Sequence, residues 1–115
     1  RAMAAMTTAL TEFSDKENYR LYTRSGHTVN KPKFVHQSRK VPTGNQVVQE
    51  DVVNIQSATN DSDGALMPQR CSITIFVKRP LGHETAIMTE LKAAAIDIIG
   101  SDEFDNTVDT SEYLK

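Results

Sequence analysis

Alternating apolar and polar side chains predict β-strands in the first two thirds of the chain. Residues 19–24 are aromatic and β-branched with one polar side, as expected for a strand with one face in water. Residues 70–78 alternate more regularly, with Phe76 as the exception on the polar side. The apolar side of that strand carries Cys71, Ile73, Ile75 and Val77, and the polar side carries Arg70, Ser72 and Thr74.

The clearest hairpin signal joins residues 33–41 to residues 46–57. Pro42, Thr43, Gly44 and Asn45 lie between them, and proline, glycine and asparagine all favour a turn. A turn centred on Thr43 and Gly44 would place Ser38 opposite Gln49 and His36 opposite Asp51. Each face of such a hairpin would mix apolar and polar residues, and a one-residue change in the loop would exchange the faces. The pattern alone therefore leaves open which hairpin face is which.

Helical spacing appears only in the last third of the chain. Residues 84–99 form an amphipathic helix with Gly100 as its C-terminal cap, and a shorter helix is predicted from residue 102 onward. Residues 58–64 form a polar loop, residues 14–18 a polar turn, and residues 3–13 fit either a strand or a helix. Strands followed by helices indicate an α+β fold with an antiparallel sheet. The apolar stripe of the long helix carries Ile87, Leu91, Ala94, Ala95 and Ile98.

Composition adds an expectation of self-association. A chain of 115 residues predicts a single domain over residues 1–115, and a hydrophobic content of 38% is low for a protein that must build its whole core alone. With both hairpin faces mixed, the helix stripe lacks a good apolar surface within its own chain. We therefore expect the stripe to be the interface of a homodimer.

Charge divides along the same line as secondary structure. Residues 18–49 contain no acidic residue but several lysines and arginines, whereas residues 81–115 carry eight acidic residues and only Lys92 and Lys115 as bases. The net charge of −2 hides this separation. A basic sheet could meet a polyanion, although a basic stretch of this size can also be an ordinary solvated sheet face.

Catalysis and metal binding find little support in the residues. His27, His36 and His83 have no metal-ligand spacing, and a His36–Asp51 pair would lack a nucleophile. Cys71, the only cysteine, is expected to be a buried structural thiol. The sequence of residues 61–64, Asp-Ser-Asp-Gly, begins like a calcium loop, but Thr59 would then be the first ligand and Arg70 would stand in place of the bidentate acid, which favours a solvated turn. No enzyme activity, cofactor, small-molecule substrate, metal site or membrane span is predicted.

The predicted strands carry the residue types that RNA recognition needs. Lysine and arginine contact phosphates, hydroxyl and amide side chains reach base edges, and aromatic rings stack on bases. Residues of these kinds on the predicted strands include Tyr19, Tyr22, His36, Ser38, Gln49, Arg70, Ser72 and Thr74.

The order of elements resembles the coat proteins of single-stranded RNA bacteriophages. The matching features are the long basic hairpin at 33–57, the polar loop at 59–68 ending in Leu-Met-Pro, the alternating strand at 70–77 and the helix at 84–99. Two features depart from that family's pattern: Glu50 and Asp51 are acidic where some members are basic, and the start of the chain shows no clear first hairpin.

The resemblance implies a viral structural protein that is not an enzyme. Two subunits would share one antiparallel sheet in an intertwined homodimer, with the helices clamped over the partner, and dimers would build an icosahedral shell around genomic RNA. Assembly would take place in the host cytoplasm and the protein would reside in the virion, with possible hairpin-specific repression of translation. A dimeric, sheet-based RNA- or DNA-binding regulator outside any virion is the alternative. The RNA-binding positions implied are Lys33, His36, Ser38, Lys40, Gln49, Arg70, Ser72 and Thr74.

Overall fold

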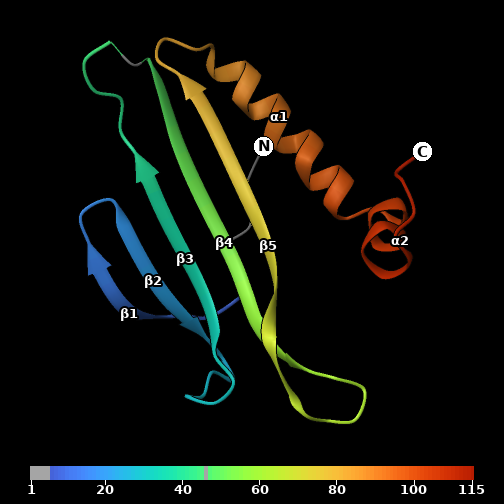
Figure 1. Cartoon of the computed structure of the whole chain (residues 1–115). Helices are drawn as coiled ribbons and strands as arrows, with labels where there is room; N and C mark the ends of the chain where they lie inside the picture. The colour runs from blue at the N-terminus through green and yellow to red at the C-terminus, as the bar shows by residue number, and fades with distance from the viewer. Residues whose placement is uncertain (1–5, 46) are drawn as a thin grey trace. The chain divides into compact units, whose positions relative to one another are not determined.

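The computed structural model describes residues 6–45 and 47–115, which form one five-stranded antiparallel sheet followed by two helices (Figure 1). Strand order in the sheet follows chain order, so every neighbour is reached by a hairpin. The α+β fold predicted from the sequence is confirmed. The elements are β1 (Leu10–Lys16), β2 (Tyr19–Arg24), β3 (Lys33–Lys40), β4 (Val48–Asn60), β5 (Leu66–Pro80), α1 (Thr85–Ile99) and α2 (Asp102–Thr110).

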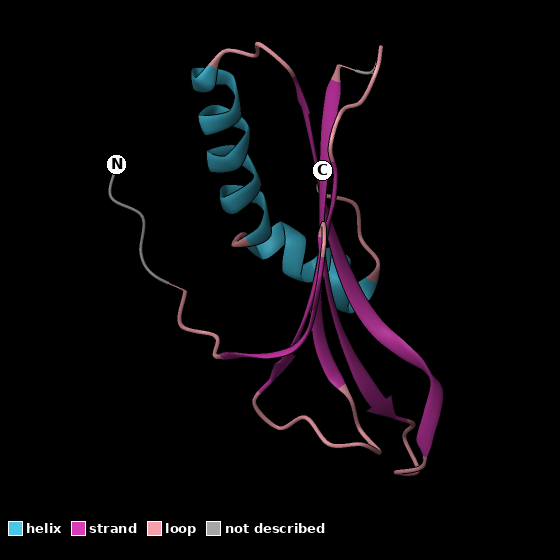
Figure 2. Cartoon of the chain, turned by 90° about the vertical axis from the view of Figure 1, so that its left-hand side faces the viewer, coloured by secondary structure: helices cyan, strands magenta, loops and turns pink. Residues whose placement is uncertain are grey.

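The chain divides into two compact units, residues 1–78 and residues 79–115. The first unit contains the sheet, whose strands form a single twisted layer when viewed nearly edge-on (Figure 2). The second unit contains α1 and α2, which pack against each other.

The first hairpin, β1–β2, was not recognised in the sequence. Of the ambiguous segment 3–13, residues 10–13 are strand, residues 3–5 lie outside the described residues, and the predicted turn at 14–18 is mostly strand as well. The reversal is confined to Glu17 and Asn18, and Asn18 has a φ of 59°, a left-handed conformation that asparagine tolerates. A bulge between Glu12 and Ser14 leaves Phe13 without a partner in the ladder.

The β3–β4 hairpin exists, but its register differs from the one that a turn on Thr43 and Gly44 would produce. His36 lies opposite Asn54, Ser38 opposite Val52 and Arg39 opposite Asp51. The shift arises because β3 ends at Lys40 and β4 begins at Val48, so a longer connection replaces the two-residue turn. Moving the register by an odd number of residues exchanges the faces of one strand relative to the other.

Strands β4 and β5 extend beyond their predicted ends and meet at a tight turn. The Asp61 carboxylate organises this turn, since its Oδ1 accepts hydrogen bonds from the backbone N–H of Asp63 at 2.9 Å and of Ala65 at 3.0 Å. Leu66, Met67 and Pro68, expected in the loop, belong to β5. A proline inside a strand is compatible with the edge position of β5.

Both predicted helices are confirmed. Helix α1 begins after Glu84 and ends at Gly100, whose N–H donates to the carbonyl of Ile96 at 3.0 Å. Helix α2 begins after Ser101, whose hydroxyl accepts a hydrogen bond from the N–H of Phe104 at 3.2 Å. This is the usual serine N-cap.

The described residues bury very few side chains. Among the described residues Val35 is the only buried hydrophobic side chain, at 9% exposure, and neither helix contains a buried residue. The helix stripe is open to solvent, with Leu91 at 53% exposure, and Cys71, predicted to be buried, is exposed. Sheets and helices normally bury one apolar face against another layer, whereas Ile73, Ile75, Ile87 and Leu91 are between 41% and 53% exposed. Within the described residues no helix is long and apolar enough to cross a membrane.

Candidate nucleic-acid interface

The register sorts the side chains of the sheet into two faces of different chemistry. Successive side chains on a strand point to opposite faces, and residues paired across strands share a face. The aromatic face carries Lys16, Tyr19, Leu21, Thr23, Phe34, His36, Ser38, Lys40, Glu50, Val52, Asn54, Gln56, Arg70, Ser72, Thr74, Phe76 and Lys78. The aliphatic face carries Tyr22, Val35, Val53, Ile55, Cys71, Ile73, Ile75 and Val77, together with the charged residues Glu12, Asp15, Arg20, Arg24, Lys33, Arg39, Asp51 and Arg79.

Phe34 is the centre of a ring cluster on the aromatic face. The ring of Phe13 meets it edge-on with centroids 5.7 Å apart, and the ring of His27 tilts over it at 4.9 Å. The Arg70 guanidinium, reaching from β5, lies 5.9 Å from the centre of the Phe34 ring. Phe13 reaches this cluster from the β1 bulge, so the irregularity of the first hairpin places a third ring beside Phe34.

Two further contacts of this kind lie on the same face. Tyr19 and His36 stack with centroids 5.9 Å apart and an interplanar angle of 28°. Lys78 places its ammonium 5.8 Å from the centre of the Phe76 ring. Phe34, Tyr19, His36, Arg70, Phe76 and Lys78 of the aromatic face thus take part in five of these ring contacts, and in the sixth Phe13 meets His27, both of which also contact Phe34.

A row of hydrogen bonds crosses the aromatic face between β4 and β5. Arg70 donates to the side-chain oxygen of Gln56 at 2.9 Å, and Gln56 donates to the side-chain oxygen of Asn54, also at 2.9 Å. Asn54 then donates to the Thr74 hydroxyl at 2.7 Å. Because each member holds the next, the two amides have fixed orientations. A ligand on this face would meet donors and acceptors already in place.

Four charges of the aliphatic face form two ion pairs. Arg20 binds Asp15 at 2.7 Å and Arg39 binds Asp51 at 2.8 Å. On the aromatic face the cations Lys16, Lys40, Arg70 and Lys78 accompany a single acidic residue, Glu50. The electrostatic potential on the aromatic face is therefore the more suitable for a polyanion.

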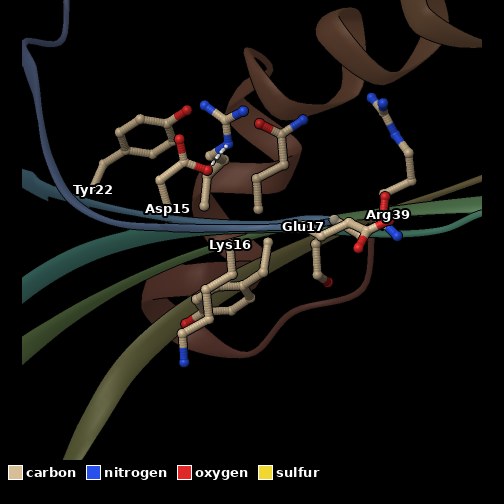
Figure 3. A pocket seen from close by; sticks show the side chains of 10 residues that line it. Asp15, Lys16, Glu17, Tyr22 and Arg39 are labelled. Atoms are coloured by element: carbon tan, nitrogen blue, oxygen red, sulfur yellow. Dashed lines mark ion pairs between the residues drawn. The ribbon is translucent and has the colours of Figure 1, made fainter.

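A hollow of about 610 Å³ surrounds the β1–β2 turn. Figure 3 shows Asp15 and Tyr22 on one side of the strand ribbon and Lys16 on the other, with the Asp15 ion pair as a dashed line. Residues from both faces of the sheet therefore line the hollow at the end of the β1–β2 hairpin. It does not collect the predicted RNA-binding residues into one enclosed site.

Six of the eight predicted RNA-binding residues share the aromatic face, and two do not. His36, Ser38 and Lys40 from β3 lie on the same face as Arg70, Ser72 and Thr74 from β5. Lys33 points to the aliphatic side, opposite Ser57, and Gln49 also lies there, donating to Asp51 at 3.1 Å. Grouping Gln49 with His36 was wrong because it assumed the shorter turn, and grouping Lys33 with His36 was wrong because residues three apart on one strand point to opposite faces.

Sequence reasoning missed several residues that dominate this face. Asn54 and Gln56 alternate with Val53 and Ile55, and that polar–apolar alternation was the signal that could have identified them. Phe13 gave no such signal, since its position depends on the bulge.

The geometry gives no support to a catalytic or metal site. His36 lies opposite Asn54. The pair considered from the sequence, in which Asp51 would orient His36 as a general base, therefore does not form. Asp51 instead binds Arg39. Within the described residues no group of three or more histidine, cysteine, aspartate or glutamate side chains could hold a metal ion. In the Asp61 turn, one carboxylate oxygen already serves two backbone amides.

Comparisons with known proteins place the fold. No protein-family model matches the sequence, and no curated protein matches it either. Solved structures do match. A virus-like particle of Wenzhou levi-like virus 4 is similar with a TM-score of 0.76 and 13% identity, over 96% of this chain and 80% of that chain. A virus-like particle of Beihai levi-like virus 32 has a TM-score of 0.75 and 14% identity, over 94% and 89% of the two chains. A virus-like particle of bacteriophage AVE019 has a TM-score of 0.71 and 13% identity, over 98% and 93%.

These similarities cover nearly the whole chain at low sequence identity, so they concern the fold. The chain has the five-stranded sheet and two C-terminal helices of subunits from levi-like virus and bacteriophage particles. The structural resemblance inferred from the order of elements is thereby confirmed.

Proposed function

We propose that this protein is the coat subunit of a single-stranded RNA phage, a structural protein and not an enzyme. Two copies form an intertwined homodimer, dimers assemble into an icosahedral shell, and the aromatic face of the sheet binds the packaged genome. The observation that carries the proposal is the similarity of nearly the whole fold to subunits of virus-like particles.

The open edge of strand β5 supports dimerisation. Strand β5 is an edge strand of 15 residues whose outer backbone groups have no partner strand in the described sheet. Natural proteins rarely leave an edge of this length open, because it invites pairing with another chain. A second copy pairing there would continue the sheet across the dimer and provide the shared sheet implied by the resemblance.

The helical unit offers the second part of that interface. Ile87, Leu91 and Ile98 on the α1 stripe are between 42% and 53% exposed. Ala94 and Ala95 lie between them on the same stripe and allow close approach of a partner surface. The aliphatic face, with Ile73 at 52% exposure and Ile75 at 41%, has the complementary character. Once a partner covers both surfaces, residues 1–115 form one coat-protein domain.

RNA binding on the opposite, aromatic face follows from the division of chemistry between the two faces. Aliphatic side chains stabilise a complex when they are buried against another protein surface, whereas cations, amides and aromatic rings are suited to binding a nucleic acid. We assign His36, Ser38, Lys40, Arg70, Ser72 and Thr74 to this contact, with Asn54 and Gln56 as additions. The fixed orientation of the amide row would allow recognition of one RNA hairpin and hence translational repression.

Size and nucleic-acid content test this proposal. Expressed in bacteria, the protein should purify as particles of megadalton mass that contain RNA, assembled in the cytoplasm. A stable dimer that binds RNA or DNA but never assembles would favour the regulator alternative. A monodisperse monomer would overturn both.

A further inference from the structure

We propose that the aromatic face holds RNA by stacking unpaired bases on two platforms, each made of an aromatic ring and a cation. The inference rests on the proposed function and adds the class of RNA that the face selects. It concerns Phe13, Phe34 and Arg70 at one end of β5 and Phe76 with Lys78 at the other.

The first platform has a ring whose surface is available to a ligand. Phe13 is 61% exposed although it touches Phe34, because the β1 bulge holds it above the ladder. The Arg70 guanidinium beside Phe34 adds positive charge and a second planar group. Bases stack on aromatic rings and on guanidinium planes alike, so the cluster offers adjoining stacking surfaces.

The second platform repeats this combination from one strand. Phe76 is 53% exposed, and Lys78 stands over its ring from two residues further along β5. The two residues share a face because of that spacing. Burying a phenylalanine is the usual way to stabilise a sheet, and here two remain largely open on the face that carries the cations.

The platforms are separated by a stretch that single-stranded RNA can bridge. Arg70 and Phe76 are six residues apart on β5, which corresponds to about 20 Å at the rise of an extended strand. The side chains of Gln56, Asn54 and Thr74 lie between the two platforms. They can form hydrogen bonds with the edges of the bases that span this stretch.

Stacking of this kind distinguishes unpaired from paired RNA. In an A-form duplex the base faces are covered by their neighbours, and a protein meets mainly phosphates and 2′-hydroxyls. Stacking also tolerates any base, because every base has a π face. The geometry therefore favours single-stranded RNA over duplex with little dependence on sequence, as suits packaging of a whole genome.

Binding of three labelled RNAs to assembly-competent dimers tests the inference. The probes are a single-stranded 12-mer, the same 12-mer in a duplex, and an abasic 12-mer that keeps the sugar–phosphate backbone. We expect the single strand to bind about fivefold to a hundredfold more tightly than the abasic strand, the range that one to a few stacked bases supply. Phe76→Leu and Phe13→Leu should each lower affinity for the single strand and leave affinity for the abasic strand unchanged. Tyr113→Leu, which removes a 92% exposed ring near the C-terminus, is the matched control and should change neither.

The outcomes separate this inference from the function on which it rests. Equal affinity for single-stranded and abasic RNA, unaffected by both phenylalanine variants, would overturn stacking while leaving RNA packaging by phosphate contacts intact. Absence of binding to all three probes would overturn RNA binding by this face itself. Both variants replace largely exposed rings, and circular dichroism checks that they fold as the parent does.

Discussion

Arg39 binds Asp51 at 2.8 Å on the aliphatic face, while Lys40, the next residue along β3, points to the aromatic face. The side chains of these two adjacent cations thus point to opposite faces of the sheet. The Asp51 side chain is only 14% exposed, so the pair fixes Arg39 against the sheet.

This relationship predicts different effects of substituting the two residues on RNA binding. Lys40→Ala and Arg70→Ala should each reduce the dependence of log affinity on log salt concentration by about 0.7, as expected for one lost phosphate contact with a single strand. Arg39→Ala should leave that slope unchanged. Binding of dimers to RNA over a salt series measures all three.

The free energy of unfolding of Arg39→Ala serves as a control for the binding experiment. A half-exposed ion pair contributes about 0–1 kcal/mol, and Gln49 still donates to Asp51 after the substitution, so unfolding should change little. An effect of Arg39→Ala on RNA binding with none for Lys40→Ala would exchange the functions assigned to the two faces.

Much of the fold was predictable because the signals were local. The α1 stripe with Gly100 after it, and the alternation along β5, both depend on residues close together in sequence. The β3–β4 register was not predictable, since it depends on the whole connection from residue 41 to 47 and on contacts with neighbouring strands. The candidate site inherited that error at Gln49, and it included Lys33 against the alternation of β3, whereas Arg70, Ser72 and Thr74 share a face whatever the hairpin register.

Leu91→Asp should abolish dimerisation and, with it, folding. The substitution would place a carboxylate in the proposed apolar interface, at a cost of several kcal/mol for an unpaired buried charge. An obligate dimer has no stable folded monomer, so loss of association appears as loss of structure. Sedimentation velocity together with circular dichroism gives both readouts.

Ala93→Asp is the matched control for that variant. It introduces the same carboxylate two residues later on α1, on the side away from the stripe, and should remain dimeric. If Leu91→Asp remained a dimer, the stripe would not be the dimer interface, whereas a folded monomer would show that the dimer is not obligate.

Hydroxyl groups on the aromatic face should matter only for RNA of a particular sequence. Ser72→Ala and Thr74→Ala remove no positive charge, so general RNA binding and its salt dependence should persist. If one hairpin is recognised, affinity for it should fall by about 1–1.5 kcal/mol per lost hydrogen bond. Selecting RNA from a random pool with the parent protein supplies the hairpin, and equal loss for selected and random RNA would argue against hairpin recognition.

The Asp61 turn should depend on hydrogen bonding and not on a metal. Asp61→Ala removes the acceptor for two backbone amides and should lower the free energy of unfolding by about 1–2 kcal/mol. Asp61→Asn keeps an oxygen acceptor and should recover most of that loss. Thermal unfolding with and without calcium measures both effects, and a calcium-dependent rise in the melting temperature of the parent but not of Asp61→Asn would show instead that the turn binds the ion.

The most direct test of the coat-subunit proposal is the mass and nucleic-acid content of the purified protein. With no tryptophan and three tyrosines in the chain, protein absorbance at 280 nm is weak, so packaged RNA would dominate the spectrum. Light scattering coupled to size-exclusion chromatography, with absorbance at 260 and 280 nm, gives both quantities in one run. We predict a megadalton peak with the absorbance ratio of nucleic acid. A dimer-sized peak free of nucleic acid under conditions that favour assembly would contradict the proposal.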